Sequence, residues 1–450
     1  MPCPALLIAA PASGQGKTTV TAALARLHAR QGRRVRVFKS GPDFLDPYWH
    51  ALASGAPVYN LDLWMNGEPD CRARLAAAAE VADLILVEGV MGLFDGEPSA
   101  ADLARRFQLP VLAVVDASAM AGTFGALAFG MQHYQPDMPW AGVLANRVAS
   151  ARHAAMLQAS VRDPAHWLGA LPPNPAYGLP ERHLGLTVAY ELPDAMARLD
   201  AAADALAATP LGQLCPADWA RWNLPALAPT PPAAPNATGQ PLKGTTIAIA
   251  EDAAFCFIYA ANRDCLQALG AKLVYFSPLQ DAALPPCDAV WLPGGYPELH
   301  AAQLATSSRT RDSLRAHVAA QKPVWAECGG MMVLFDTLQT RDGQCHAQWG
   351  ILPGQVRMQS RLARLGPQQL ALSGGVLRGH TFHYSLTETP LPPACYTAPP
   401  GPWPAGGDAE QGEAVWRHGS VHASYFHAWF PSSPAAVAEL FAPVCAASNH

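Results

Sequence analysis

The chain has 450 residues, of which 50% are hydrophobic and 14% are charged, and its formal net charge is −5. This length allows two or three domains, each with its own core. The acidic balance argues against a general binder of nucleic acid or of anionic membranes. No run reaches the ~20 apolar residues that span a bilayer. Ten cysteines are scattered without a C-x-x-C pair, which argues against a structural zinc site and favours a reduced, cytoplasmic compartment.

The first half of the chain alternates short apolar runs with alanine-rich stretches. The runs predicted as strands are residues 6–10, 35–39, 84–88, 111–116 and 141–146. Residues 18–29 and 120–131 are predicted to be helices. Strands that alternate with helices in this way indicate a parallel sheet with helices on both faces.

A phosphate-binding loop is predicted between the first strand and the first helix. Its sequence is Ser13-Gly14-Gln15-Gly16-Lys17-Thr18-Thr19. Free N–H groups at a glycine-rich helix start can hold phosphate, the lysine adds a positive charge, and the first threonine can place its hydroxyl on Mg²⁺. The usual pattern of such loops is G-x-x-x-x-G-K-[ST]. Pro11 stands in place of its first glycine. A Gly-Ser turn before an ordinary helix is the alternative, but the flanking strand and helix favour ATP binding by Ser13, Gly14, Gly16, Lys17, Thr18 and Thr19.

Acidic residues follow the second and third predicted strands. Asp43 and Asp46 leave the second strand, and Glu88 and Asp95 leave the third. Ligands of an open parallel sheet bind beyond the carboxyl ends of its strands, where carboxylates can hold Mg²⁺ or orient a reacting group. Turn chemistry is the alternative for each of them. Asn146, at the end of a later strand, is a candidate for base recognition or for capping a turn.

Residues 225–241 are rich in proline and alanine and are predicted to be an extended linker. They separate an ATP-binding domain at residues 1–224 from a second domain at residues 242–450. In the second domain the strand-like runs are residues 246–250, 273–276, 289–292 and 324–326, with further β character at 379–385 and 421–425.

The second domain carries a cysteine in the setting of a nucleophile. Cys328 lies between the strand-like Pro323-Val324-Trp325-Ala326 and the pair Gly329-Gly330. Small residues let the chain turn sharply from strand to helix, and a thiol at a helix N-terminus is expected to favour the thiolate. Gly294 and Gly295, after the preceding strand, can line an oxyanion hole together with Gly329. A buried, inert cysteine is the alternative. His422 and His427, in the segment 419–430 near the C-terminus, are the candidates for the base.

Several segments together resemble known proteins. Pro-Gly-Gly-Tyr-Pro-Glu (293–298), Ala-Glu-Cys-Gly-Gly-Met (326–331) and Ala-Ser-Tyr-Phe-His (423–427) resemble the class I glutamine amidotransferase domain, in the branch that amidates corrin precursors. The segments around residues 39–47, 87–96, 179–186 and 378–385 narrow this to a resemblance to the cobyrinate/hydrogenobyrinate a,c-diamide synthase family. The resemblance runs from the first strand to about residue 430.

The resemblance implies an α/β protein of two domains: a phosphate-loop domain of the dethiobiotin-synthetase type and a flavodoxin-like amidotransferase domain. It implies that Cys328 attacks the side-chain amide of glutamine and that His427 is the base. Most class I glutaminases have a glutamate two residues after this histidine, where this chain has Trp429. Thr381 likewise stands where relatives usually carry glutamate.

The function implied is a glutamine-hydrolysing carbon–nitrogen ligase of cobalamin biosynthesis. ATP and Mg²⁺ would convert the a and c carboxylates of cobyrinic acid to acyl phosphates, which ammonia then displaces. The resemblance implicates Asp43, Asp46, Glu88 and Asp95 in metal binding or substrate positioning, without settling which does which. We expect Thr18, Asp43 and Glu88 to bind the metal, Asn146 to bind ATP, and Asp46 and Asp95 to position the substrate. The polyanionic substrate needs local cations, for which the candidates are Arg182, His183, Arg357, Arg361 and Arg364. Hydrogenobyrinic acid, a nickel tetrapyrrole, the reaction of cobyric acid synthase and a partitioning-type nucleotide switch are the alternatives. The partners are small molecules, and a homodimer is compatible with this interpretation.

Overall fold

The computed structural model describes residues 3–182, 185–186, 189–227, 239–401 and 412–442. The chain divides into two compact units, residues 1–233 and 234–450. The predicted linker crosses this division, and its residues 228–238 lie outside the described ranges. Within the described ranges, no helix is both long enough and apolar enough to cross a bilayer.

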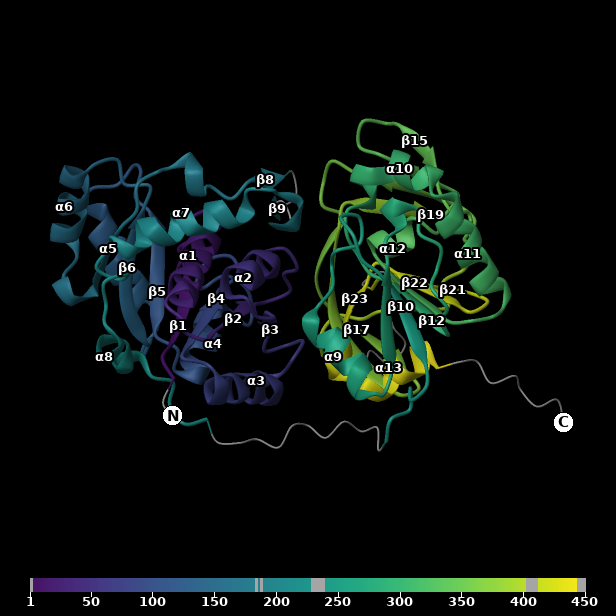
Figure 1. The fold of residues 1–450 in the computed structure, drawn as a ribbon, viewed down its shortest axis with the longest axis horizontal. Coiled ribbons are helices and arrows are strands. Elements are labelled where there is room, and N and C mark those ends of the chain that lie inside the picture. The colour runs from purple at the N-terminus through teal and green to yellow at the C-terminus, as the bar shows by residue number, and fades with distance from the viewer. Residues whose placement is uncertain (1–2, 183–184, 187–188, 228–238, 402–411, 443–450) are drawn as a thin grey trace. The chain divides into compact units, whose positions relative to one another are not determined.

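The first unit is built on a parallel sheet of seven strands with the order β3-β2-β4-β1-β5-β6-β7 (Figure 1). In chain order the strands are β1 (Ala5–Ala9), β2 (Val35–Ser40), β3 (Tyr59–Leu61), β4 (Leu84–Glu88), β5 (Val111–Asp116), β6 (Trp140–Asn146) and β7 (Trp167–Ala170). The five strands predicted from sequence are present within one residue at each end. β3 and β7 were not predicted, because each is only three or four residues long.

Helices cover both faces of this sheet, as the alternation of strands and helices predicted. They are α1 (Lys17–Arg30), α2 (Asp46–Ser54), α3 (Glu68–Val81), α4 (Ala100–Phe107), α5 (Thr123–His133), α6 (Ala151–Ser160), α7 (Ala195–Ala207) and α8 (Pro216–Trp219). Neighbouring residues of a strand point to opposite faces. Leu7 of β1 therefore packs with residues of α3, α4 and α5, whereas Leu6 packs with residues of α1, α2 and α7. A short hairpin, β8 (Glu181–Arg182) with β9 (Gly185–Leu186), follows β7 in the chain.

The second unit is built on a mixed sheet with the order β11-β10-β12-β13-β22-β21-β20. Its strands are β10 (Thr246–Ala250), β11 (Lys272–Phe276), β12 (Ala289–Leu292), β13 (Val324–Glu327), β20 (Cys395–Tyr396), β21 (Ala414–His418) and β22 (Val421–Ser424). The first five strands in this order are parallel, and β21 and then β20 continue the sheet at one edge with antiparallel pairing. Together with the first unit, this confirms the predicted α/β class.

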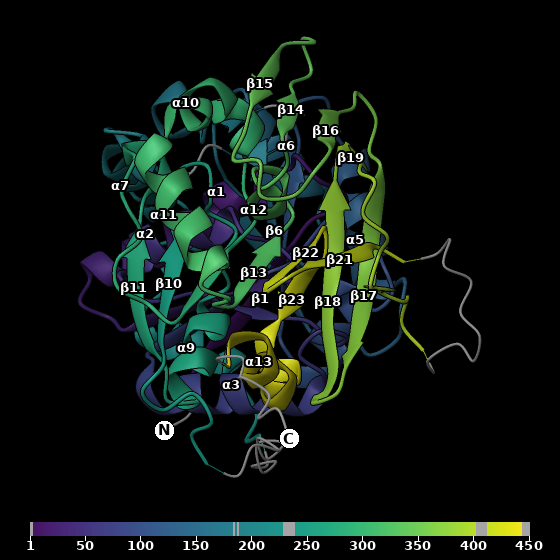
Figure 2. The same ribbon diagram turned by 90° about the vertical axis from the view of Figure 1, so that its right-hand side faces the viewer.

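Two smaller sheets extend the second unit (Figure 2). The first contains β14 (Thr337–Gln339), β15 (Cys345–Ala347), β16 (Gln355–Met358) and β19 (Ser385–Glu388), and the second contains β17 (Arg364–Leu372), β18 (Gly375–His383) and β23 (His427–Trp429). The helices are α9 (Ala260–Ala268), α10 (Ala301–Thr306), α11 (Ser308–Ala319), α12 (Gly329–Met332) and α13 (Pro434–Phe441). Pairing of β18 with β23 places His380 directly opposite His427.

Candidate functional sites

The predicted phosphate loop joins the carboxyl end of β1 to α1, and its backbone is held from the neighbouring strands. Gly16 caps α1 with a φ of 96°, a conformation that favours glycine. The Nδ2 of Asn146 donates to the carbonyl of Gln15 at 2.8 Å, and a Cβ on Gly16 would lie 2.2 Å from that nitrogen. The side chain of Gln15 accepts from the backbone N–H of Asp116 at 2.8 Å. In this structure Asn146 therefore supports the loop.

The ammonium group of Lys17 is directed at the loop after β4. Its Nζ donates to the carbonyl of Met91 at 2.6 Å and to that of Ala12 at 3.3 Å. Burial lowers the pKa of Lys17, and the neighbouring ammonium of Lys39 lowers it further. Asp95 accepts from the backbone N–H of Gly92 at 2.8 Å, so its carboxylate closes the turn that presents Met91 to the lysine.

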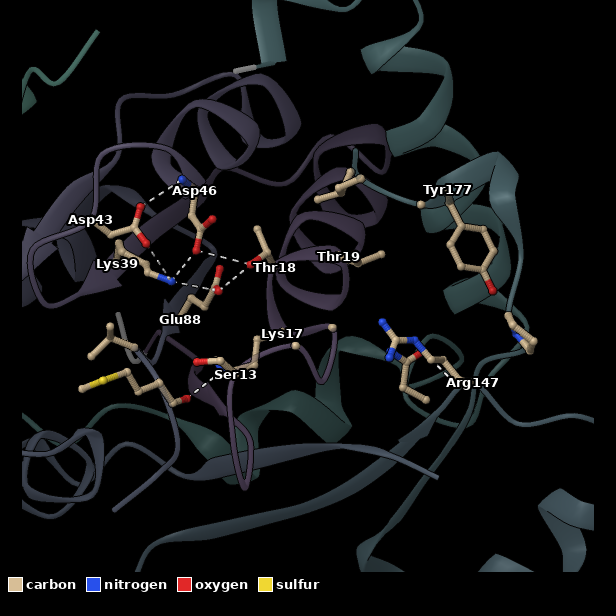
Figure 3. Close-up of a pocket in the computed structure, with 18 of the residues that line it drawn as sticks. Ser13, Lys17, Thr18, Thr19, Lys39, Asp43, Asp46, Glu88, Arg147 and Tyr177 are labelled. Carbon is tan, nitrogen blue, oxygen red and sulfur yellow. Dashed lines mark hydrogen bonds and ion pairs between the residues drawn. The ribbon is translucent and has the colours of Figure 1, made fainter. Parts of the chain in front are cut away.

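A buried cluster of charges lies beside the phosphate loop (Figure 3). The hydroxyl of Thr18 donates to Glu88 at 2.8 Å and to Asp46 at 3.3 Å. Lys39 Nζ lies 2.5 Å from Asp46 Oδ2 and 3.0 Å from Glu88 Oε1, and His50 Nε2 contacts the other oxygen of Glu88. Burial opposes the charge on Lys39, but the surrounding carboxylates hold its pKa well above the ordinary value. Lys39 and His50 likewise lower the pKa of Glu88 against its burial.

Asp43 has a different setting from Asp46. One of its oxygens accepts the backbone N–H groups of Leu45 and Asp46, at 2.9 and 3.1 Å, and the other lies 3.6 Å from Lys39 Nζ. Asp46, rather than Asp43, therefore stands next to the hydroxyl of Thr18.

These residues line a cavity of about 480 Å³ at the carboxyl edge of the first sheet (Figure 3). Predicted residues on its wall are Ser13, Gly14, Gly16, Lys17, Thr18, Thr19, Asp43, Asp46, Glu88 and Asn146. Arg147 and Tyr177 are on the wall as well and were not predicted. A cavity of this size suits a nucleotide.

The other predicted binding residues are spread over the chain. Arg182 lies in β8, and His183 lies outside the described residues. Arg357 pairs with Glu388, Arg361 is exposed, and Arg364 lies 3.4 Å from Glu413. The three arginines belong to the second unit.

Cys328 occupies the sharp turn between β13 and α12. Its φ of 43° is rare for a residue with a side chain, and its backbone N–H donates to Ser424 at 2.7 Å. The expected preference for thiolate is wrong for this structure. Burial raises the pKa of Cys328, the negative charge of Glu298 adds to this, and α12 is only four residues long. The thiol therefore needs a base.

The predicted oxyanion glycines pack against this turn without room for side chains. A Cβ on Gly329 would lie 2.9 Å from the nitrogen of Gly295, and one on Gly294 would lie 2.4 Å from Cε1 of His427. Gly295 therefore lies against the turn at Cys328, while its neighbour Gly294 lies against His427. Backbone N–H groups at such a turn are the usual donors to an oxyanion.

The two candidate histidines lie in different places. His422 pairs with Trp325 in the middle of β13, and Arg417 and Glu439 are its charged neighbours. His427 is 1% exposed, lies beside the glycine turn and stacks on His380 with ring centroids 4.9 Å apart. Burial holds the pKa of His427 well below its ordinary value, so the free imidazole is neutral and has a nitrogen available to accept a proton. Trp429 is buried against Tyr259.

No role was predicted from sequence for Lys39, His50, His380, His383 or Glu413, although Lys39, His380 and His383 lie in segments that carry the resemblance. Lys39 lies at the carboxyl end of a predicted strand, just before Asp43 and Asp46. Because ligands bind at that edge of the sheet, its position could have indicated a role in the site. His50 lies on α2 and Glu413 precedes β21. Nothing in their local sequence points to a site, because only the tertiary fold brings them there.

The fold and these two sites define a nucleotide-binding domain joined to a glutamine amidotransferase domain. Residues 6–186 match the family described as the CobQ/CobB/MinD/ParA nucleotide binding domain, and residues 246–435 match the CobB/CobQ-like glutamine amidotransferase domain.

Relatives align over almost the whole chain. The hydrogenobyrinate a,c-diamide synthase of Stutzerimonas stutzeri is 56% identical, covering 98% of this chain and 99% of the relative. That of Pseudomonas aeruginosa is 55% identical, covering 98% of each. The cobyrinate a,c-diamide synthase of Herminiimonas arsenicoxydans is 50% identical, covering 97% of this chain and 96% of the relative. The chain belongs to the cobyrinate/hydrogenobyrinate a,c-diamide synthase family, which confirms the resemblance.

Proposed function

We propose that this protein is an ATP- and glutamine-dependent ligase that converts the a and c carboxylates of cobyrinic acid to amides. The observation that carries the proposal is the similarity, from end to end, to relatives named for this pair of amidations. The chain carries both a cavity at the phosphate loop and the Cys328 turn. This supports the proposal, because the reaction needs a site for ATP and a nucleophile for glutamine.

The first unit activates the carboxylate. A carboxylate reacts poorly with ammonia because its oxygen is a poor leaving group, and transfer of the γ-phosphoryl group of ATP removes this obstacle. Lys17 and the N–H groups of the phosphate loop stabilise the phosphate charge. Lys39 is held between the carboxylates of Asp46 and Glu88 on the cavity wall, where its charge fixes their positions.

The residues beside Thr18 fit Mg²⁺. Its hydroxyl and the carboxylates of Glu88 and Asp46 converge within 3.3 Å, and Mg²⁺ prefers such hard oxygen ligands together with phosphates. We assign the metal to these three residues and leave Asp43 to hold the start of α2. The metal would supply charge neutralisation at the phosphates.

The second unit supplies ammonia. His427 takes the proton of Cys328, the sulfur attacks the side-chain amide of glutamine, and the backbone N–H groups of Gly295 and Gly329 face the oxyanion. Ammonia leaves with a proton returned by His427, and water releases glutamate from the thioester. Ammonia then displaces phosphate at the first unit, once for each side chain.

Hydrogenobyrinic acid is the second candidate substrate. The two relatives at 56% and 55% identity are named for it, whereas the relative at 50% is named for cobyrinate. Arg182 and His183 stay candidates for binding the corrin carboxylates. The reduced cysteines predicted from sequence agree with a cytoplasmic location, and a homodimer stays a prediction.

The test offers the purified protein cobyrinic acid or hydrogenobyrinic acid with ATP, Mg²⁺ and glutamine, and identifies the product by mass. We expect a diamide whose formation needs both ATP and glutamine. Absence of any amide from both substrates would disprove the proposed function, and the ratio of the two rates decides whether the preferred corrin contains cobalt.

A further inference from the structure

The strand that carries the candidate base lies at the edge of its sheet. β23 ends the sheet β17-β18-β23, and its inner neighbour is β18 (Figure 2). The backbone groups on its outer edge belong to Ala428 and to Phe430, which directly follows the strand. These residues are 1% and 0% exposed, so water does not solvate that edge. Buried N–H and C=O groups need partners within the protein, and another part of the chain has to supply them.

The side-chain amide of Asn262 covers this edge where a further strand would otherwise lie. Its Nδ2 donates to the carbonyl of Ala428 at 2.8 Å, and its Oδ1 accepts from the backbone N–H of Phe430 at 2.8 Å. Asn262 lies in the first turn of α9 and is 1% exposed. One buried amide therefore holds two backbone groups of the segment that carries His427.

The same segment is bound on its other side to the strand that leads into the nucleophile. The backbone N–H of Cys328 donates to the carbonyl of Ser424 at 2.7 Å. The backbone N–H of Ala428 donates to Glu327 Oε1 at 3.4 Å. Because Ala428 directly follows His427, a shift of its backbone would move the imidazole relative to the sulfur.

The residues that precede Asn262 pack against the same strand. The ring of Phe257 lies 6.0 Å from that of His427, and the ring of Tyr259 lies 5.1 Å from that of Trp429. These aromatic side chains surround the side chains of β23, whereas Asn262 bonds to the backbone. The start of α9 and the segment before it thus form a frame around the base.

We propose that Asn262 is a positioning residue of the glutaminase site: its two hydrogen bonds to the backbone hold the His427 imidazole where it can take the proton of Cys328. The position two residues after the base, where most class I glutaminases have glutamate, holds the buried Trp429. In this chain the backbone on both sides of Trp429 is held instead. The inference rests on the proposed function for the identity of the reaction.

The experiment measures glutamate release from glutamine by the full-length protein and by Asn262→Leu and Asn262→Asp. Leucine has a similar branched shape but makes neither bond, whereas aspartate keeps an oxygen for Phe430 and places its other oxygen against the carbonyl of Ala428. Both variants should lower kcat about 10²-fold, because a displacement of about 1 Å costs this much. The KM for glutamine should stay within about threefold, because Cys328 and the glycine turn are unchanged.

The pH dependence distinguishes a misplaced base from a smaller folded fraction. Burial raises the pKa of Cys328, so a variant without a placed base relies on hydroxide to remove the thiol proton. The ratio of variant to wild-type kcat should therefore rise about tenfold per pH unit above about pH 7. Loss of folded protein would lower this ratio equally at every pH. Burial raises the pKa of Glu298 to about 7 and that of Glu327 to about 8 in both proteins, and the ratio cancels their titration.

Gln369→Leu is the matched control. This buried amide on β17 donates to the carbonyls of Pro399 and Gly401 at 3.1 and 2.9 Å, so the change also removes two bonds between an amide and the backbone from the sheet that contains β23. Its kcat should stay within about twofold of wild type at every pH. Synthesis from ammonium chloride should be the same in all variants, because the first unit is unchanged.

Three results would each overturn the inference. They are an Asn262→Asp kcat within about threefold of wild type, a kcat ratio that does not change with pH, and an equal loss in Gln369→Leu. If Asn262→Leu does not fold, the near-isosteric Asn262→Asp decides. Wild-type protein that releases glutamate but makes no amide would instead count against the proposed function, and the kcat ratios would still decide the inference.

Discussion

Buried polar contacts hold charged groups in both units at the level of single residues. Lys39 lies between Asp46 and Glu88 in the first unit, and His383 Nε2 lies 3.1 Å from Glu413 Oε1 in the second. A buried pair contributes little net stability, but removal of one partner leaves an unpaired charge and costs about 3–5 kcal/mol. These residues therefore tolerate little change, even where they do not touch a substrate.

The contributions of Cys328 and Lys17 to the reaction can be distinguished by substitution. Cys328→Ser keeps the turn but replaces the thiol with a weak nucleophile, so synthesis from glutamine should fall by at least about 10³-fold. Synthesis from ammonium chloride should continue at the wild-type rate, because the first unit is unchanged. Lys17→Ala removes charge stabilisation of the phosphates and should lower both rates by about 10²-fold or more. The measurement is the initial rate of amide synthesis by each variant, with glutamine and with ammonium chloride. A Cys328→Ser variant that is fully active with glutamine would refute the assignment of Cys328 as the nucleophile.

At the scale of elements, each site depends on a glycine beside which there is no room for a side chain. Gly16 at the start of α1 also has a φ of 96° and lies against Asn146, whereas Gly294 after β12 lies against His427. The first glycine shapes the phosphate loop, and the second lets the backbone after β12 approach the His427 ring closely. The sites are thus specified by backbone conformation as well as by side chains.

Substitution of these glycines should have separate effects. Gly16→Ala places a Cβ 2.2 Å from Asn146 Nδ2 and should abolish ATP binding measured by calorimetry, while glutamate release persists. Gly294→Ala places one 2.4 Å from His427 and should abolish glutamate release, while ATP binding persists. Gly130→Ala is the control, because Gly130 is an exposed residue of α5. Apart from its chain neighbours and the backbone of its own helix, no atom lies within 4 Å of the position that a methyl group would take. The change should stabilise the helix by about 0.5–1 kcal/mol. Equal loss of both activities in either variant would contradict the assignment.

The strands that carry the sites were predictable, because apolar runs with sharp ends mark buried parallel strands. The phosphate loop and the Cys328 turn were recognisable for the same reason, since each lies directly after such a strand. The hydrogen-bond partners were not predictable. His50 reaches Glu88 from α2, and Glu413, just before β21, reaches His383 at the end of β18, so both contacts depend on tertiary packing. The pKa shift of Cys328 was predicted in the wrong direction, because burial raises the pKa and α12 is only four residues long.

At the scale of the whole molecule, the reaction requires two units with separate cores to act in sequence. Each unit has its own sheet and its own site, so either half-reaction can in principle proceed alone. The product of the second unit is ammonia, which becomes unreactive ammonium once it is protonated in water. Efficient synthesis therefore requires that ammonia reach the acyl phosphate before it equilibrates with the solvent.

Transfer of ammonia without release to the solvent is the last prediction. At equal low concentrations, glutamine should support faster diamide synthesis than ammonium chloride near neutral pH, because little of the added ammonium is present as free ammonia. Raising the pH increases that free fraction, so the rate with ammonium chloride should climb toward the rate with glutamine. The buried His427 has a lowered pKa and is already neutral at pH 7, so the rate with glutamine should not follow the same rise. Initial rates with both nitrogen sources across this pH range test the idea, and equal rates at neutral pH would show that ammonia passes through bulk water.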